Sequence, residues 1–123
     1  MIGELDEPED EMTFLQRIKQ IFKVSCLRHN QPTGRQVRRV ALCGGAGAFL
    51  LPQAISAGAD VFLTGEIKYH DYFGHETEIL MAEIGHYESE QYTVEILQSV
   101  LYRSFPDLKV QLSKINTNPI KYL

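Results

Sequence analysis

The stretch VRRVALCGGAGAFL, residues 37–50, contains the transition that decides the fold. Residues 37–43 are apolar and β-branched enough to predict a buried strand. The glycine-rich turn at residues 44–47 follows at once, and the apolar residues from Phe49 to Ile55 predict a short helix that ends at Gly58. A buried strand that leads through a tight turn into a helix is the repeating step of an α/β fold.

Helices and strands alternate along the rest of the chain. Thr13 and Gln16 form a capping-box signature that predicts the start of a helix, with Phe14, Leu15 and Ile18 on its apolar face. The pattern further predicts strands at residues 24–27, 60–63, 79–84 and 108–112, a loop at 29–34, and helices at 70–77 and 89–104. We therefore expect a single α/β domain over residues 1–123, a mostly parallel sheet flanked by helices.

The composition narrows the function classes. The chain has 123 residues, of which 44% are hydrophobic and 23% charged, with a net charge of -4. These values predict a globular domain and argue against a nucleic-acid partner. No apolar run approaches the ~18 residues of a membrane span, and residues 1–12 form an acidic, solvated lead-in without signal-peptide character. We expect a cytoplasmic protein with no membrane partner and with Cys26 and Cys43 reduced.

Three segments with candidate functional residues directly follow predicted strands. In α/β folds, binding and catalytic sites lie at the carboxyl ends of the strands. The first is the glycine turn. Gly44, Gly45 and Gly47 could hold an anion through backbone N–H groups, or form a tight turn that lets helix and strand pack closely. Leu50 stands where the dinucleotide-binding pattern needs glycine or alanine, and no Gly-Lys-Ser/Thr follows, so neither nucleotide fingerprint is matched.

The second segment follows the strand predicted at residues 60–63 and runs from Thr64 to Asp71. Two carboxylates, a histidine and a hydroxyl group lie within it. On a helix, Glu66 and His70 would be neighbours one turn apart. The alternative is that Thr64 and Asp71 cap local backbone and that His70 is a surface residue.

The third segment is GHYESE, residues 85–90. His86 and Glu90 are four residues apart, so a helix points both side chains the same way. An imidazole and a carboxylate suit a divalent transition metal such as Zn, Fe, Mn or Ni. The same helix face continues through Val94, Leu97 and Leu101, which predicts that it faces the core. The alternative is a helix cap made by Ser89 or Glu90.

Taken together, RVALCGGAGAFL, GADVFLTGEIKYHD and GHYESE resemble the Nif-three-like dinuclear metal-centre family, whose members are often named GTP cyclohydrolase I type 2 homologues. The opening MIGELDEP resembles the segment that leads out of that family's inserted domain, and NTNPIKYL resembles its C-terminus. The resemblance implies two pseudo-equivalent α/β halves in a protein two to three times longer. This chain is similar to the C-terminal half, as an expressed fragment or a truncated gene product.

The resemblance also implies a metal pair with ligands from both halves. The family's first half brings a His-His pair and an acidic residue, and no His-His dipeptide occurs here. The second half brings the histidine and glutamate of Gly-His-x-x-Ser/Thr-Glu, which fall on His86 and Glu90. Glu66 and His70 would orient ligands or water. Intact members are implied to be ring-shaped homohexamers, and we expect this piece to form dimers or larger homo-oligomers.

Three functions remain open at this point. The chain is half of a metal-dependent, GTP cyclohydrolase-like hydrolase whose isolated site is incomplete and inactive. Alternatively, it is a scaffold or regulatory protein with a structural metal, or a small anion- or nucleotide-binding module centred on the glycine turn.

Overall fold

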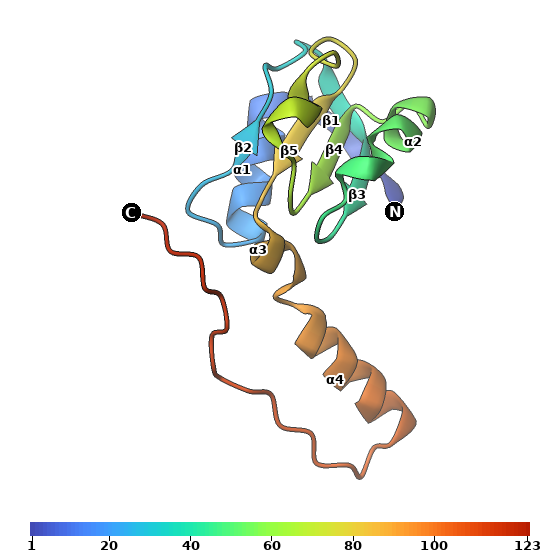
Figure 1. Ribbon diagram of the computed structural model, residues 1–123. Helices are drawn as coiled ribbons and strands as arrows, with labels where there is room; N and C mark the ends of the chain where they lie inside the picture. The colour runs from blue at the N-terminus through green and yellow to red at the C-terminus, as the bar shows by residue number, and fades with distance from the viewer.

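The computed structural model describes residues 1–123 and contains a five-stranded sheet in the order β1-β3-β4-β5-β2 (Figure 1). Strands β3 (Gln36–Cys43), β4 (Val61–Thr64) and β5 (Leu80–Glu83) are parallel and form its centre. Strands β1 (Ile2–Asp10) and β2 (Arg28–His29) lie antiparallel to β3 and β5 at the two edges. The predicted α/β fold is confirmed, and the three central strands are parallel as predicted. The sheet as a whole is mixed, because both edge strands are antiparallel, and these edges were not predicted.

Two apolar layers cover the two faces of the sheet. Successive residues of a strand point to opposite faces, so Val61 and Leu63 pack with helix α1 (Glu11–Ile21) while Phe62 packs with helix α2 (Leu51–Ser56). The α1 layer includes Phe14, Leu15, Ile18, Val37, Val40, Leu80, Ala82 and Ile84. The α2 layer includes Ala41, Leu51, Ala54, Ala59, Ile67, Ile79 and Met81. Burial on both faces explains why β4 and the first three residues of β5 are continuous apolar runs. Strand β3 is only partly buried, because Gln36, Arg38 and Arg39 in its first half are exposed.

The register of the parallel strands brings the predicted functional segments together. Cys43 of β3 pairs with Thr64 of β4, and Thr64 pairs with Glu83 of β5. The three strands therefore end at the same level of the sheet. The segments that follow them, the glycine turn, residues 65–68 and helix α3 (His86–Glu90), start side by side. The predicted gathering of these segments at one edge is confirmed.

The N-terminal segment differs from the prediction. Residues expected to form an acidic, solvated lead-in form strand β1, whose residues are mostly exposed because it lies at the sheet edge. Helix α1 begins at Glu11, two residues before the predicted capping box. Asp10 is the N-cap, because its carboxylate accepts hydrogen bonds from the backbone N–H groups of Met12 and Thr13, at 2.9 and 3.1 Å.

Three further predictions are wrong. Residues 24–27 are not a strand; β2 follows directly after them and overlaps the predicted loop only at His29. Asn30 fixes β2 beside β5, because it donates to the Ile79 carbonyl at 3.0 Å and accepts from the Met81 N–H at 2.8 Å. The helix predicted at 70–77 is only the 3₁₀ turn η2 (Tyr69–Tyr72). Residues 108–112 have no regular structure, because no strand lies beside them to supply a ladder.

The helix predicted at 89–104 is divided into α3 and α4 (Thr93–Ser104). Figure 1 shows α4 projecting away from the sheet, with residues 105–123 running back toward it. The prediction that one face continues into the core is wrong, because α4 has left the body of the domain and none of its residues is buried. Val94, Leu97 and Leu101 are 51%, 57% and 37% exposed. With 12 residues, α4 is the longest helix, and none of the helices has the length and hydrophobicity needed to cross a bilayer.

Candidate functional site

Short hydrogen bonds fix α3 onto the glycine turn. The Gly45 N–H donates to Ser89 Oγ at 2.8 Å, and Ser89 Oγ donates to the His86 carbonyl at 2.8 Å. From the other side, the Gly65 N–H and Thr64 Oγ1 both donate to the Gly45 carbonyl, at 3.0 and 3.1 Å. The turn, the end of β4 and the start of α3 therefore form one connected unit.

The glycine turn uses its N–H groups inside the protein. The Gly45 N–H is taken by Ser89, and the Gly47 N–H donates to the Gly45 carbonyl and to Thr64 Oγ1, at 3.0 and 3.1 Å. A Cβ at Gly47 would lie 2.5 Å from Thr64 Oγ1 and 2.7 Å from the Cβ of Cys43. Between the two interpretations of this turn, the geometry favours close packing over an anion held by Gly45 and Gly47.

His86 and Glu90 project from the same side of α3, as their spacing predicts. His86 Nε2 lies 3.5 Å from Glu90 Oε2, and each side chain is about half exposed, at 50% and 52%. Both groups converge over Gly45. A Cβ at that glycine would lie 2.6 Å from Glu90 Oε1 and 3.3 Å from His86 Nε2. Gly45, with φ +64°, thus leaves open the space into which the two donor atoms point.

Glu66 sets the orientation of the His86 ring. Its Oε2 lies 3.1 Å from His86 Nδ1. An ionised carboxylate can only accept a hydrogen bond, so in the neutral imidazole Nδ1 carries the hydrogen and Nε2, which faces Glu90, has the lone pair. A carboxylate that fixes the tautomer of a histidine in this way is the usual partner of a metal-binding imidazole. Residue 66 lies outside any helix, so the one-turn spacing that a helix would give Glu66 and His70 does not occur.

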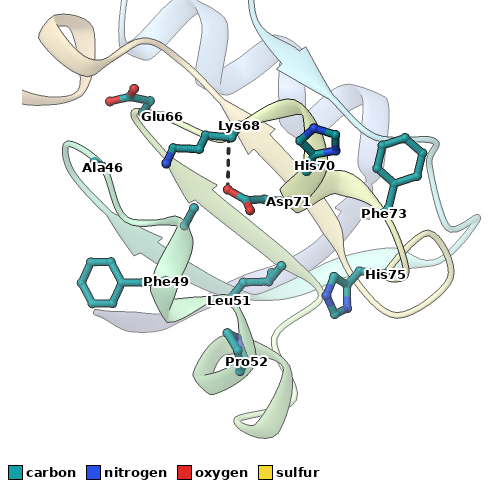
Figure 2. Close-up of a pocket in the computed structure, with 11 residues that line it drawn as sticks. Ala46, Phe49, Leu51, Pro52, Glu66, Lys68, His70, Asp71, Phe73 and His75 are labelled. Atoms are coloured by element: carbon teal, nitrogen blue, oxygen red, sulfur yellow. Dashed lines mark hydrogen bonds between the residues drawn. The ribbon is translucent and has the colours of Figure 1, made fainter.

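His70 lies apart from this cluster. It belongs to η2, and its ring packs edge-on against Tyr69 with the centroids 5.2 Å apart. In Figure 2, Glu66 and His70 lie at different ends of the segment that joins them. The structure therefore joins Glu66 to His86 but does not join His70 to either residue.

The donor set fits part of a divalent metal site. An imidazole nitrogen with a free lone pair and a carboxylate oxygen, open to solvent on one side, are suitable ligands for transition metals. No group of three or more His, Cys, Asp or Glu side chains is placed to hold a metal ion. Catalytic zinc sites use three protein ligands and structural sites four. His86 and Glu90 by themselves therefore provide fewer side chains than either kind of zinc site uses.

Sequence reasoning missed a second carboxylate network, centred on Glu83 at the end of β5. The Glu83 side chain is 11% exposed, pairs with Arg28 and accepts from the Ile67 N–H at 3.1 Å and from the Tyr72 hydroxyl at 3.4 Å. It thereby ties β2 and η2 to the centre of the sheet. The only sequence signal was an acidic residue in an apolar strand.

Tyr72 provides a pH test of this network. Burial, reinforced by the Glu83 carboxylate, raises the pKa of Tyr72 from 10.0 to about 12. The folded state keeps the phenol protonated where the unfolded chain ionises, so this stabilisation is complete below pH 10 and is lost as pH rises through 12. The free energy of unfolding, measured by urea denaturation, should fall less between these pH values in Tyr72→Phe than in wild type. Tyr69→Phe is the control, because Tyr69 is 70% exposed, and its free energy of unfolding should depend on pH as that of the wild type does.

The fold and site define an α/β unit that presents a histidine and a glutamate above a glycine turn at the carboxyl edge of a parallel sheet. The family model Duf34/NIF3 (NGG1p interacting factor 3) matches residues 1–119. The chain belongs to the DUF34/NIF3 family, as the sequence motifs indicated.

Individual relatives cover nearly all of the chain. The GTP cyclohydrolase 1 type 2 homolog of Staphylococcus aureus (strain COL) is 33% identical over an alignment 130 residues long, which covers 99% of this chain and 35% of that protein. The crystal structure of the Staphylococcus aureus hypothetical protein SA1388 matches 99% of this chain and 42% of its own, with 31% identity and a TM-score of 0.91. The crystal structure of a Bacillus cereus protein related to NIF3 matches 99% of this chain and 35% of its own, with 27% identity and a TM-score of 0.78. The chain thus spans well under half the length of these relatives, as expected for one half of the fold.

Proposed function

We propose that this chain supplies one half of a dinuclear divalent-metal centre, with His86 and Glu90 as ligands. The observation that carries the proposal is the convergence of His86 Nε2 and Glu90 Oε1 over Gly45, at 3.3 and 2.6 Å from where a Cβ would lie. Any other residue at position 45 would fill that space. Glu66, bonded to His86 Nδ1 at 3.1 Å, supports the same role by presenting the free nitrogen.

The reaction class proposed for the complete protein is metal-dependent hydrolysis. A divalent ion at such a site supplies Lewis-acid chemistry. In this chain, Glu66 orients the imidazole and Ser89 holds α3 at the turn through the Gly45 N–H at 2.8 Å. The name of the Staphylococcus aureus relative suggests a GTP cyclohydrolase-like activity for the whole protein. A scaffold or regulatory protein with a structural metal is the second candidate, favoured by the incomplete ligand set.

The missing ligands point to assembly. We propose that they come from a further part of a longer protein or from a second copy of this chain in a homo-oligomer. The exposed apolar side chains of α4, with Ile96 at 60% and Leu97 at 57%, supply a surface on which such assembly can form. A cytoplasmic location, in which both free cysteines stay reduced, remains part of the proposal.

Paramagnetic broadening tests the metal ligands even when affinity is low. Addition of Mn²⁺ to the ¹⁵N-labelled chain should broaden the amide signals of residues 44–46 and 86–90. His86→Ala and Glu90→Ala should each remove this effect, because each deletes one of the two donors. His29→Ala, which changes an exposed histidine on β2, is the control and should keep the broadening. Broadening that persists in His86→Ala, or that centres elsewhere, would contradict the proposal.

A further inference from the structure

A groove opens beside Glu66, the residue that is bonded to His86 (Figure 2). Its volume is about 540 Å³, within the range of ~300–1,000 Å³ usual for small-molecule sites. One wall comes from the glycine turn, the 3₁₀ turn η1 (Ala48–Leu50) and the start of α2, and the other from the segment that follows β4. Glu66 lines the groove and also bonds His86 Nδ1 at 3.1 Å, so the groove ends at the candidate site.

The groove has an apolar wall with exposed aromatic rings. Leu51 and Pro52 line the side formed by α2. Phe49 and Phe73 also line the groove and are 73% and 55% exposed. Phenylalanine rings left this open present π faces on which a flat ring can stack. The wall is therefore suited to an aromatic group.

Some polar groups of the groove already make hydrogen bonds or ion pairs within the protein, and others do not. The acidic groups have partners: Glu66 bonds His86, and Asp71 Oδ2 accepts from the Lys68 backbone N–H at 3.3 Å. His75 pairs with Glu78 at 2.7 Å. The Lys68 ammonium makes no ion pair or hydrogen bond, and Figure 2 shows its side chain extending into the groove on the side of Ala46. The His70 ring likewise makes no hydrogen bond. The groups left unengaged are thus a cation and an imidazole.

We propose that this groove binds a small aromatic phosphate, with the phosphate at Lys68 and the ring against Phe49. A lysine ammonium is a common point-charge ligand for phosphate. Glu66 lines the groove and is also bonded to His86. A molecule held in the groove in this way therefore reaches the edge of the His86 and Glu90 site. The role of the groove as a substrate site rests on the proposed function, whereas its binding of the ligand does not.

Titration with phenyl phosphate in the presence of a chelator tests the binding without metal. Amide shifts in the ¹⁵N-labelled chain should centre on Ala46, Phe49 and Lys68. Lys68→Met should weaken binding by about tenfold, the equivalent of ~1.4 kcal/mol, because the charge is lost while the stem is kept. Lys109→Met, at an exposed lysine outside the groove, should bind as wild type.

The aromatic part of the proposal has its own test. Phe49→Ala should weaken phenyl phosphate binding several-fold, whereas Phe105→Ala, at a ring that is 60% exposed and outside the groove, should have no effect. Inorganic phosphate should bind more weakly than phenyl phosphate. Equal affinity of the two, wild-type affinity in Lys68→Met, or no binding by the wild-type chain would each overturn the proposal.

The metal experiment separates this proposal from the function on which it rests. Lys68→Met should keep the Mn²⁺ broadening around His86, because Lys68 supplies no metal ligand. If phenyl phosphate binds as described but Mn²⁺ does not, the groove stands and the proposed metal function fails. If Mn²⁺ binds but phenyl phosphate does not, the groove proposal alone fails.

Discussion

Replacing Gly65 with alanine is expected to lower the free energy of unfolding by about 2–3 kcal/mol, at the upper end of the cost of overpacking. A Cβ at this buried position would lie 2.5 Å from Ser89 Oγ, 2.8 Å from the Gly45 carbonyl oxygen and 3.1 Å from the Gly45 nitrogen. Two of these atoms are backbone, so no side-chain rotation relieves the contact. Either the glycine turn or α3 must move away from the end of β4.

The measurement is urea denaturation followed by far-UV circular dichroism. Gly3→Ala is the matched control, because no atom lies within 4 Å of its Cβ position and its backbone is not in the left-handed region. It should change the free energy of unfolding by no more than about 0.5 kcal/mol. Because Gly65→Ala displaces Ser89, it should also weaken Mn²⁺ binding at His86. An unfolding midpoint equal to that of Gly3→Ala would show that α3 does not pack tightly against β4.

The central sheet and its functional edge could be predicted because their signals are local. Strands buried on both faces appear as continuous apolar runs, so β4 and β5 stand out in the sequence. Strand β3 stands out through its apolar second half, residues 40–43, which leads into the glycine turn. Glycines after such runs mark the turns that must bring backbones together, and position 47 has a neighbour 2.5 Å from its Cβ position. The spacing of His86 and Glu90 also needs only the period of one helix.

The missed features depend on contacts between distant parts of the chain. Strand β2 has only two residues and exists because Asn30 bonds Ile79 and Met81, about fifty residues away along the chain. The pairing of Glu66 with His86 spans 20 residues, and that of Glu83 with Arg28 spans 55. The break between α3 and α4 carries no proline or glycine, so the local pattern predicted a continuous helix.

Glu11 is another residue whose role no local pattern reveals, and its replacement by alanine should be strongly destabilising. Its side chain lies at the start of α1, where the residue is only 3% exposed. One carboxylate oxygen accepts from the Thr33 N–H at 3.0 Å and from Thr33 Oγ1 at 2.7 Å, and the other accepts from the Gly34 N–H at 2.9 Å. Glu11→Ala leaves three donors without this acceptor, and we expect a loss of about 3 kcal/mol of unfolding free energy.

Two variants separate the hydrogen bonds from the loss of an acidic residue. Glu11→Gln keeps one side-chain oxygen and should lie between wild type and Glu11→Ala in urea denaturation. Glu7→Ala removes an exposed carboxylate from β1 and should change stability by less than about 0.5 kcal/mol. Hydrogen exchange gives the local readout, since the amides of Thr33 and Gly34 should exchange much faster in Glu11→Ala. Unchanged exchange at both amides, with a stability equal to that of Glu7→Ala, would mean that this carboxylate does not hold the loop that leads into β3.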